Sequence, residues 1–430
     1  ITANVIALES READFGGDTA IIVSCDLLYI PFEVLELVRT TVRERLPKLD
    51  THKIFLNGTH THTAPVLLLD KYPIPGDGVM QVEQYRSLLA RRVADAIIRA
   101  WNARRAGSVT WGLSHAVVAY NRRAVYADGS AQMYGKTDRP DFRNLEGYED
   151  HDVNTLFFWN GEGELIAIAV NVSCPSQEIE SRSTVNADFW HPVRTILHKQ
   201  YGQQLCVVGW TGASGDQSPH LMYRKAADER MRRLRGLDRV QEIARRITRA
   251  VDEAYEAVKN DRHSDVALIH KVETIQLPMR FVTQAEYTEA KAAVEKAAAR
   301  IAQNPEAAAR EYRRMKWYAK TVRRFERQQK DRRPTYEMEL HVVRLGDVAI
   351  CTNPFELFTD YGIRIKARSK AVQTFVVQLV GQASYLPTEK AIRGGHYSAV
   401  VHSSLVGPEG GTVLVDRTVN VINSLWPDPG

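Results

Sequence analysis

The chain has 430 residues, of which 44% are hydrophobic and 25% are charged, and its formal net charge is +5. This composition is typical of a globular protein with a large buried core. There are four cysteines and none forms a CxxC pair, which argues against a disulfide scaffold and against a zinc knuckle. No apolar stretch of the sequence is long enough to span a membrane.

The basic excess gathers in two runs, near 231–246 and 310–333. Such runs can attract nucleic acid, phosphate or anionic lipid. Acidic residues are interspersed in both runs at helical spacing, which favours solvent-exposed helix faces instead. We therefore expect no nucleic-acid partner.

Short apolar runs rich in β-forming residues predict buried strands. These runs lie at 19–28, 52–60, 165–174, 205–212, 342–352 and 374–381. Helical patterns at 31–46 and 82–104 follow the first two of them. The alternation predicts an α/β fold in which mixed or mostly parallel sheets are layered with helices. The first ten residues read as the middle of a strand, so we expect that a leader or first element has been removed.

Segment 284–330 is rich in Ala, Glu, Lys and Arg and is interrupted by Asn304-Pro305, which predicts an inserted helical hairpin. No repeat and no interdomain linker is evident, so we expect one domain over 1–430. Gly and Pro cluster where we expect loops over a site, at 71–79, 394–395 and 408–411.

The first candidate site is the stretch Asn57-Gly-Thr-His-Thr-His-Thr-Ala-Pro65, which directly follows a predicted strand. Alternate side chains of extended backbone point the same way, so His60 and His62 share a face. Two imidazoles at the end of a strand suit a metal site, one as ligand and the other as second ligand, proton carrier or substrate contact. The alternative is a pair of surface histidines in a turn.

The second candidate is the small-residue turn Gly212-Ala-Ser-Gly-Asp-Gln-Ser-Pro-His220, which follows the strand at 205–212. Such a turn exposes backbone N–H groups and lets a substrate approach closely. Ser218 is a candidate nucleophile and Asp216 a candidate orienting group. A Ser and an Asp that merely cap a turn are the alternative.

The third candidate is Cys174, which stands beside a proline at the end of the strand predicted at 165–174. A thiolate there would be a good zinc ligand, and a half-buried inert thiol is the equally weighted alternative. Further polar residues could face the same cleft: Gln177, Glu178, Asp188 and His191. For Asp188, a helix-capping role is the alternative.

The fourth candidate is Glu356, just past the strand at 342–352 and bracketed by bulky apolar residues. An acid held among apolar neighbours is costly unless it is paired or metal-bound. A solvent-facing helix start is the alternative.

Five motifs in order across nearly the whole chain resemble the catalytic domain of the neutral ceramidase family. GTHTHTAP resembles the family's zinc-binding THTHSGP, and GDQSP at 215–219 resembles its GDVSP nucleophile motif. NRR at 121–123 resembles its substrate segment, and NPFEL at 353–357 resembles its PGE zinc-ligand segment. ASYLPTEKA at 383–391 resembles the segment whose tyrosine binds zinc. Five motifs in one order indicate the superfamily rather than a particular substrate.

The resemblance implies a Zn²⁺ cofactor on His60, Glu356 and Tyr385, with Ser218 as the nucleophile. It also implies further residues near the substrate: His62, Asn121, Arg122 and Tyr397. The implied reaction is hydrolysis of an N-acyl amide or a related polar linkage, in which zinc polarises the scissile oxygen or activates water. His62 would carry the proton, and Arg122 with the turn at 212–215 would stabilise developing negative charge.

Three departures from the family pattern bear on the substrate. The family's zinc-ligand His before a proline is Cys174 here, so the fourth ligand would be Cys174 itself, His191 or Glu178. The sequence contains no segment like the family's C-terminal β-domain, and the helical hairpin is an addition.

Two competing hypotheses remain open. One is a zinc-dependent glycosidase or sugar-conjugate hydrolase with Cys174 as a zinc-bound thiolate. The other is a catalytically degenerate binding protein that docks through its basic helices. For an enzyme we expect a small-molecule, lipid or glycoconjugate substrate, with a homo-oligomer as one possible assembly. The resemblance suggests a secreted or periplasmic location.

Overall fold

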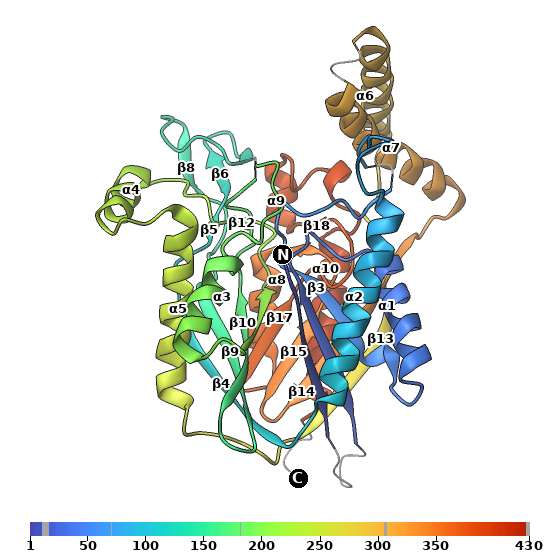
Figure 1. Ribbon diagram of the computed structural model, residues 1–430. Coiled ribbons are helices and arrows are strands. Elements are labelled where there is room, and N and C mark those ends of the chain that lie inside the picture. Colours follow the sequence, from blue (N-terminus) through green and yellow to red (C-terminus); the bar gives the residue numbers. More distant parts are fainter. Residues whose placement is uncertain (11–16, 70, 181, 305–307, 427–430) are drawn as a thin grey trace.

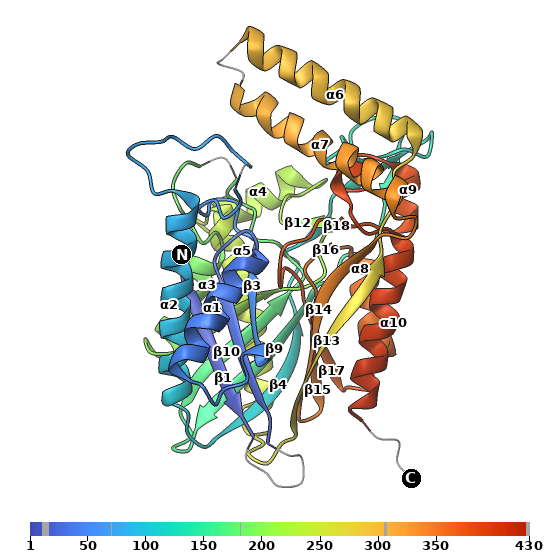
Figure 2. The same ribbon diagram turned by 90° about the vertical axis from the view of Figure 1, so that its right-hand side faces the viewer.

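The computed structural model describes residues 1–10, 17–69, 71–180, 182–304 and 308–426. Three mixed sheets stand side by side with helices on their outer faces, and a helical hairpin projects from one end (Figures 1 and 2). This confirms the predicted α/β fold with mixed sheets.

Each of the three larger sheets combines antiparallel pairing with one parallel pair. The first has the order β1-β2-β3 and contains β1 (Ala3–Glu9), β2 (Thr19–Cys25) and β3 (Ile54–Gly58). The second has the order β11-β10-β9-β4 and contains β4 (Gly107–His115), β9 (Asp152–Asn160), β10 (Leu165–Val172) and β11 (Cys206–Thr211). The third has the order β13-β14-β15-β17 and contains β13 (Leu268–Pro278), β14 (Thr335–Leu345), β15 (Val348–Thr352) and β17 (Gln373–Val377). The parallel pairs are β2 with β3, β10 with β11, and β15 with β17.

Three small sheets lie toward the end from which the hairpin projects (Figure 1). One pairs β5 (Tyr120–Asn121) with β12 (Gln217–Ser218), and another pairs β16 (Glu356–Leu357) with β18 (Tyr385–Leu386). The third has the order β7-β6-β8 and contains β6 (Arg123–Tyr126), β7 (Ala131–Met133) and β8 (Phe142–Leu145). These short strands carry many of the candidate site residues.

Helices cover the outer face of each large sheet. The first sheet packs against α1 (Phe32–Arg45) and α2 (Val82–Asn102), the second against α3 (Trp190–Tyr201) and α5 (Arg239–Val258), and the third against α8 (Thr359–Arg368) and α10 (Pro408–Ser424). The remaining helices are α4 (Lys225–Leu234), α6 (Gln284–Gln303), α7 (Ala308–Lys330) and α9 (Glu389–Gly394), with short 3-10 turns at Thr51–Lys53 and Val401–Ser403. The inner faces of all three sheets meet in a shared core that includes Phe55, Trp210 and Phe375. Strands buried on both faces explain why their sequences are almost continuously apolar.

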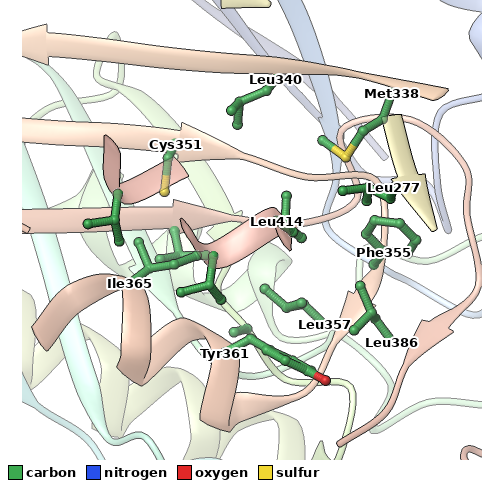
Figure 3. Close-up of a cluster of buried hydrophobic side chains, with 14 of the residues drawn as sticks. Leu277, Met338, Leu340, Cys351, Phe355, Leu357, Tyr361, Ile365, Leu386 and Leu414 are labelled. Atoms are coloured by element: carbon green, nitrogen blue, oxygen red, sulfur yellow. The ribbon is translucent and has the colours of Figure 1, made fainter. Parts of the chain in front are cut away.

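The core beneath the third sheet anchors part of the candidate site. Leu357 and Leu386 are register partners of β16 and β18, and both point into this cluster beside Phe355 and Tyr361 (Figure 3). Successive side chains of a strand point to opposite faces. The preceding partners, Glu356 and Tyr385, are therefore held together on the other face of the same ladder.

Most predicted elements are confirmed within a few residues, and the hairpin predicted at 284–330 is the pair α6 and α7, although Pro305 lies outside the described residues. Two predictions are wrong. The strand predicted at 342–352 is two strands, β14 and β15, because Gly346 adopts a φ of 59° and turns the chain between them. The predicted loop at 408–411 is the first turn of α10, where Pro408 occupies a position that needs no N–H donor.

The sequence analysis found no apolar stretch long enough to span a membrane, and the helices of the structure agree with this. Within the described ranges, no helix is both long and apolar enough to cross a bilayer.

Candidate functional site

Most of the candidate residues lie in the loops and short strands that follow the carboxyl ends of the parallel strands. Hydrogen bonds tie these loops together: Ser176 N–H donates to Thr59 O at 3.2 Å, and Gln378 N–H donates to Thr211 O at 3.0 Å. The region beyond the carboxyl ends of strands is where α/β folds usually bind ligands. Sheet pairing thus brings segments near residues 60, 176, 218, 356 and 385 to one end of the molecule.

His60, Glu356 and Tyr385 converge at this end. His60 Nε2 lies 3.6 Å from Glu356 Oε2. Tyr385 is the register partner of Glu356. His60 adopts a φ of 70°, a conformation uncommon outside glycine, and its backbone N–H donates to Leu27 O at 2.9 Å. The surrounding loop therefore holds His60 against its local preference, as is common at functional sites.

The donor chemistry of this trio fits a divalent metal such as zinc. His60 Nδ1 lies 2.9 Å from Leu28 O, which places the imidazole proton on Nδ1 and leaves the Nε2 lone pair facing the Glu356 carboxylate. Burial lowers the pKa of His60, so two electron-pair donors face each other without a proton between them. Two ligands of a tetrahedral zinc with bonds of about 2.0–2.1 Å stand roughly 3.3 Å apart, close to the spacing seen here. Anchoring of the other ring nitrogen on a carbonyl is also typical of metal-binding histidines.

Tyr385 completes a set of three donors. Burial raises the pKa of Tyr385 well above 10 and Glu356 adds to the effect, so the phenol is neutral even though the Arg122 guanidinium acts in the opposite direction. Catalytic zinc sites commonly use three protein ligands and keep one position open. Among all the described residues, no group of three or more His, Cys, Asp or Glu side chains could hold a metal ion, so a site here depends on the Tyr385 phenol as its third donor.

The sequence candidates for a fourth ligand lie in other environments. Cys174 is fully buried in the core under the second sheet, and its Sγ lies 3.5 Å from Val118 O. Burial raises the pKa of this thiol well above its usual value. Glu178 pairs with Arg239 at 2.5 Å, and His191 lines a separate cleft beside α3. The contacts of Cys174 favour the inert core thiol.

Ser218 sits at the centre of a cluster of donors. Its Oγ accepts hydrogen bonds from Tyr134 OH at 3.1 Å, Gln177 Nε2 at 3.3 Å and the backbone N–H of His220 at 3.0 Å. A hydroxyl oxygen has only two lone pairs, so three donors suit an oxygen that carries negative charge. Gln177, a predicted substrate contact, thus lies against the candidate nucleophile.

Arg122 joins the Ser218 cluster to the trio. Its Nη1 donates to Tyr134 OH at 3.0 Å, and its Nη2 donates to Gly215 O at 2.9 Å and to Tyr385 OH at 3.5 Å. Arg122 is fully buried. Burial works to lower the pKa of Arg122, but Tyr385 and Tyr134 outweigh it and raise that pKa above its usual value. A permanent cation therefore polarises the phenol that donates to Ser218.

Asp216 and Asn121 form hydrogen bonds that hold the Ser218 turn in position. Asp216 Oδ1 accepts from the N–H and the hydroxyl of Thr359, at 2.8 and 2.7 Å, at the start of α8. Its Oδ2 accepts from Asn121 Nδ2 at 3.1 Å. Asn121 lies on β5, whose only register pairs are with β12, the strand that carries Ser218. In this structure both residues position the Ser218 turn.

Gly215 permits the close approach of the Ser218 turn to β16. Its N–H donates to Leu357 O at 2.7 Å, and a Cβ built at Gly215 would lie 2.2 Å from Glu356 O. Any other residue must push the Ser218 turn away from Glu356. The glycine in the GDQSP motif is therefore required by contact rather than by backbone conformation.

We expect Gly215→Ala to lower the free energy of unfolding by about 1–3 kcal/mol, the usual cost of an overpacked position. Urea unfolding followed by fluorescence measures this change. The control is Gly76→Ala, where a Cβ would meet nothing within 4 Å and the change should stay within about 0.5 kcal/mol. Equal stability of Gly215→Ala and wild type would contradict the contact.

His62 belongs to a second polar group beside the trio. Its ring lies 5.0 Å from that of His60, and its Nδ1 lies 3.3 Å from Glu180 Oε1. His220 lies nearby, with its Nε2 4.0 Å from Glu180. Burial, its largest cause, lowers the pKa of His62 well below 6.5, although about a third of the side chain remains exposed. His62 is therefore neutral at neutral pH and able to accept a proton.

Asp188 braces the loop that carries Gln177 and Glu180. Its carboxylate accepts from the backbone N–H of Ile179 and of Phe189, both at 2.7 Å, and its φ is 53°. Burial raises the pKa of Asp188 to about 6. It also lines a cleft of about 790 Å³ with Glu178, Glu180 and His191. Hydrogen bonds to backbone N–H groups are what the capping alternative predicts for Asp188. Its place in the cleft is what the prediction of a substrate-binding residue requires.

Tyr397 lies at the rim of the site. Its ring packs edge-on against Tyr385 with 5.7 Å between centroids, and Trp317 of α7 lies 5.9 Å away on the other side. Half of Tyr397 is exposed (49%). Burial of the phenol and nearby Glu356 raise the pKa of Tyr397 to about 12.

Sequence reasoning missed Tyr134 and His220 as site residues. Tyr134 follows the short strand β7 and adopts a φ of 55°, and no motif in the sequence marks it. His220 ends the small-residue turn, and that position was the available signal. Their rings lie 5.9 Å apart, on one side of Ser218.

Comparison with known proteins identifies the fold. No family model matches the sequence, and no curated protein matches it significantly. The crystal structure of neutral ceramidase from Pseudomonas aeruginosa aligns over 98% of this chain and 70% of that chain, with a TM-score of 0.65 and 15% identity. A ceramidase complexed with C2 aligns over 99% and 72%, with a TM-score of 0.63 and 14% identity. At this level of identity the similarity establishes a shared fold.

Proposed function

We propose that the protein is a zinc-dependent hydrolase that cleaves an N-acyl amide or a related polar linkage. The observation that carries the proposal is the position of Arg122, which donates both to Tyr134 beside Ser218 and to Tyr385, the register partner of Glu356. One buried cation thus contacts both the phenol that donates to the candidate nucleophile and one of the three metal donors. The fold shared with two ceramidases supports an amide substrate by analogy.

The chain's own residues supply most of the chemistry. When bound by His60, Glu356 and Tyr385, zinc would supply Lewis-acid polarisation of the scissile oxygen. Ser218 Oγ would attack the acyl carbon, since its three donors stabilise the oxygen as it loses its proton. The C–N bond would break, the amine would leave with that proton, and water would then hydrolyse the acyl ester and free Ser218.

Two residues would assist this attack. His62 would take up the proton, because its lowered pKa keeps the imidazole neutral at neutral pH. Arg122 would stabilise negative charge through its buried, permanently charged guanidinium.

The thiolate glycosidase receives no support from these contacts. Cys174 Sγ faces two backbone carbonyls in an apolar core, and burial raises its pKa. A reactive thiolate needs an electropositive and accessible setting. The convergence of His60, Glu356 and Tyr385 favours an enzyme over a metal-free scaffold.

Metal binding tests the ligand set directly. We expect one zinc ion per wild-type chain, and we expect His60→Ala to weaken zinc affinity by more than about 100-fold, because loss of a partner outside the ligand set already costs 10–100-fold. Zinc content is measured by mass spectrometry after dialysis against zinc buffers of known free concentration. The control is His52→Ala, which changes an exposed histidine that precedes the His60 motif in the sequence. This variant should retain wild-type zinc affinity.

Two results would count against this proposal. One is a wild-type protein that binds no zinc in the buffered series, and the other is His60→Ala binding zinc as tightly as wild type. Hydrolysis is tested in parallel with chromogenic N-acyl 4-nitroanilides of increasing acyl length.

A further inference from the structure

A small pocket adjoins the candidate site next to His62. It has a volume of about 230 Å³, and its lining includes Leu28, Leu67, Tyr29, Lys71 and Tyr72. This volume is below the roughly 300–1,000 Å³ of pockets that hold drug-sized ligands. Such a pocket accepts a short chemical group rather than a long alkyl chain.

Lys71 places a positive charge in the wall of this pocket. Its Nζ donates to Tyr29 OH at 3.1 Å and lies 5.1 and 5.5 Å from the ring centroids of Tyr29 and Tyr72. Among the described residues, Lys71 forms no ion pair with a carboxylate. Glu356 is the acid that acts on it electrostatically, but this carboxylate already faces His60 and Tyr385. A half-buried ammonium without a counter-ion is unfavourable, so an arriving anion would be stabilised.

The hairpin adds a second layer of positive charge above the pocket. The guanidinium of Arg313 on α7 lies 5.7 Å from the ring of Tyr72, so two cations contact one aromatic ring. Lys320 lies two turns further along the same face of α7, and its pKa is lowered by burial and by the charge of Lys71. In the part of the chain that the structure describes, no carboxylate pairs with Arg313 or Lys320. Trp317, between them on this face, contacts Tyr397 at the rim of the site.

We propose that the Lys71 pocket binds a short anionic group of the substrate, namely a carboxylate, sulfate or phosphate a few atoms from the scissile bond. This rests on the proposed hydrolase function, and it narrows the substrate to an anionic N-acyl compound. Burial also lowers the pKa of Lys71, which is consistent with an ammonium that lacks a partner. The hairpin would then help to select substrates by charge.

A matched pair of substrates tests the proposal. Succinyl 4-nitroanilide carries a carboxylate, and its carboxamide analogue has nearly the same shape without the charge. We expect wild type to prefer the carboxylate by at least about tenfold in kcat/KM, since the carboxamide cannot form a charge-assisted hydrogen bond with Lys71. Lys71→Met should reduce this preference to nearly one, mainly through KM. Lys71→Arg should retain part of it, and Lys320→Met should lower it less than Lys71→Met.

The control is Lys296→Met, an exposed lysine on α6, which should keep the wild-type preference. Equal and measurable rates for the two substrates in wild type, or an unchanged preference in Lys71→Met, would overturn the proposal. Calorimetric titration with monomethyl succinate, ethyl sulfate and ethyl phosphate measures which of the three anionic groups binds most tightly. It also separates the two proposals: binding that is lost in Lys71→Met, without any hydrolysis by wild type, would support the pocket and refute the hydrolase.

Discussion

Ser218→Ala is expected to lower kcat for N-acyl substrates by at least about 10³-fold, because removal of a nucleophile leaves only the catalysis due to binding and charge stabilisation. The Ser218 side chain is fully buried and accepts three hydrogen bonds. Loss of one small hydroxyl leaves Tyr134 and Gln177 hydrogen-bonded to each other at 2.6 Å, so the fold should persist. Single-turnover kinetics and thermal unfolding of the same preparation separate chemistry from stability.

Cys174→Ser provides the decisive comparison with Ser218→Ala. If Ser218 is the nucleophile, Cys174→Ser retains hydrolysis and loses some stability, because a more polar hydroxyl replaces a core thiol. Ser87→Ala, on the exposed face of α2, serves as the control for a serine substitution. Full activity of Ser218→Ala with an inactive Cys174→Ser would reverse the assignment and restore the thiolate hypothesis.

Arg122→Met is expected to reduce kcat by about 10²–10³-fold, the usual cost of removing a donor that stabilises charge in the transition state. The change removes the cation that donates to Tyr134, Gly215 O and Tyr385. It also leaves the buried Gly215 carbonyl without this donor, so we expect lower stability as well. Steady-state kinetics measures kcat and KM, and calorimetry measures the unfolding midpoint.

Tyr134→Phe separates the catalytic effect of Arg122 from its structural effect. It keeps the ring and the guanidinium, but it removes the hydroxyl that donates to Ser218 Oγ and accepts from Arg122 and Gln177. We expect a fall in kcat of about 10-fold or more, because one donor to a developing charge is lost, with a smaller loss of stability than in Arg122→Met, because the guanidinium keeps its bond to Gly215 O. Arg233→Met, an exposed change on α4, should alter neither quantity. A loss of stability in Arg122→Met with unchanged kcat would restrict Arg122 to a structural role.

The secondary structure was largely predictable because strands buried on both faces leave long apolar runs in the sequence. The runs at 19–28, 165–174 and 205–212 correspond to β2, β10 and β11. The run at 342–352 was misread because apolar periodicity does not reveal a tight turn, and Gly346 was the signal overlooked. The charged hairpin was predictable from composition and a proline break, but its position over Tyr397 and Tyr72 was not.

The sequence by itself determined which reactive side chains directly follow the ends of strands. His60, Ser218 and Glu356 each follow a buried strand, and strand ends of this kind gather at one edge in an α/β fold. Only the tertiary structure decided which groups meet. Register between β16 and β18 aligns Glu356 with Tyr385, and the buried guanidinium of Arg122 bridges to Tyr134, which no motif marks. Packing likewise turned Cys174 toward the core, since side-chain direction depends on long-range contacts that local patterns do not encode.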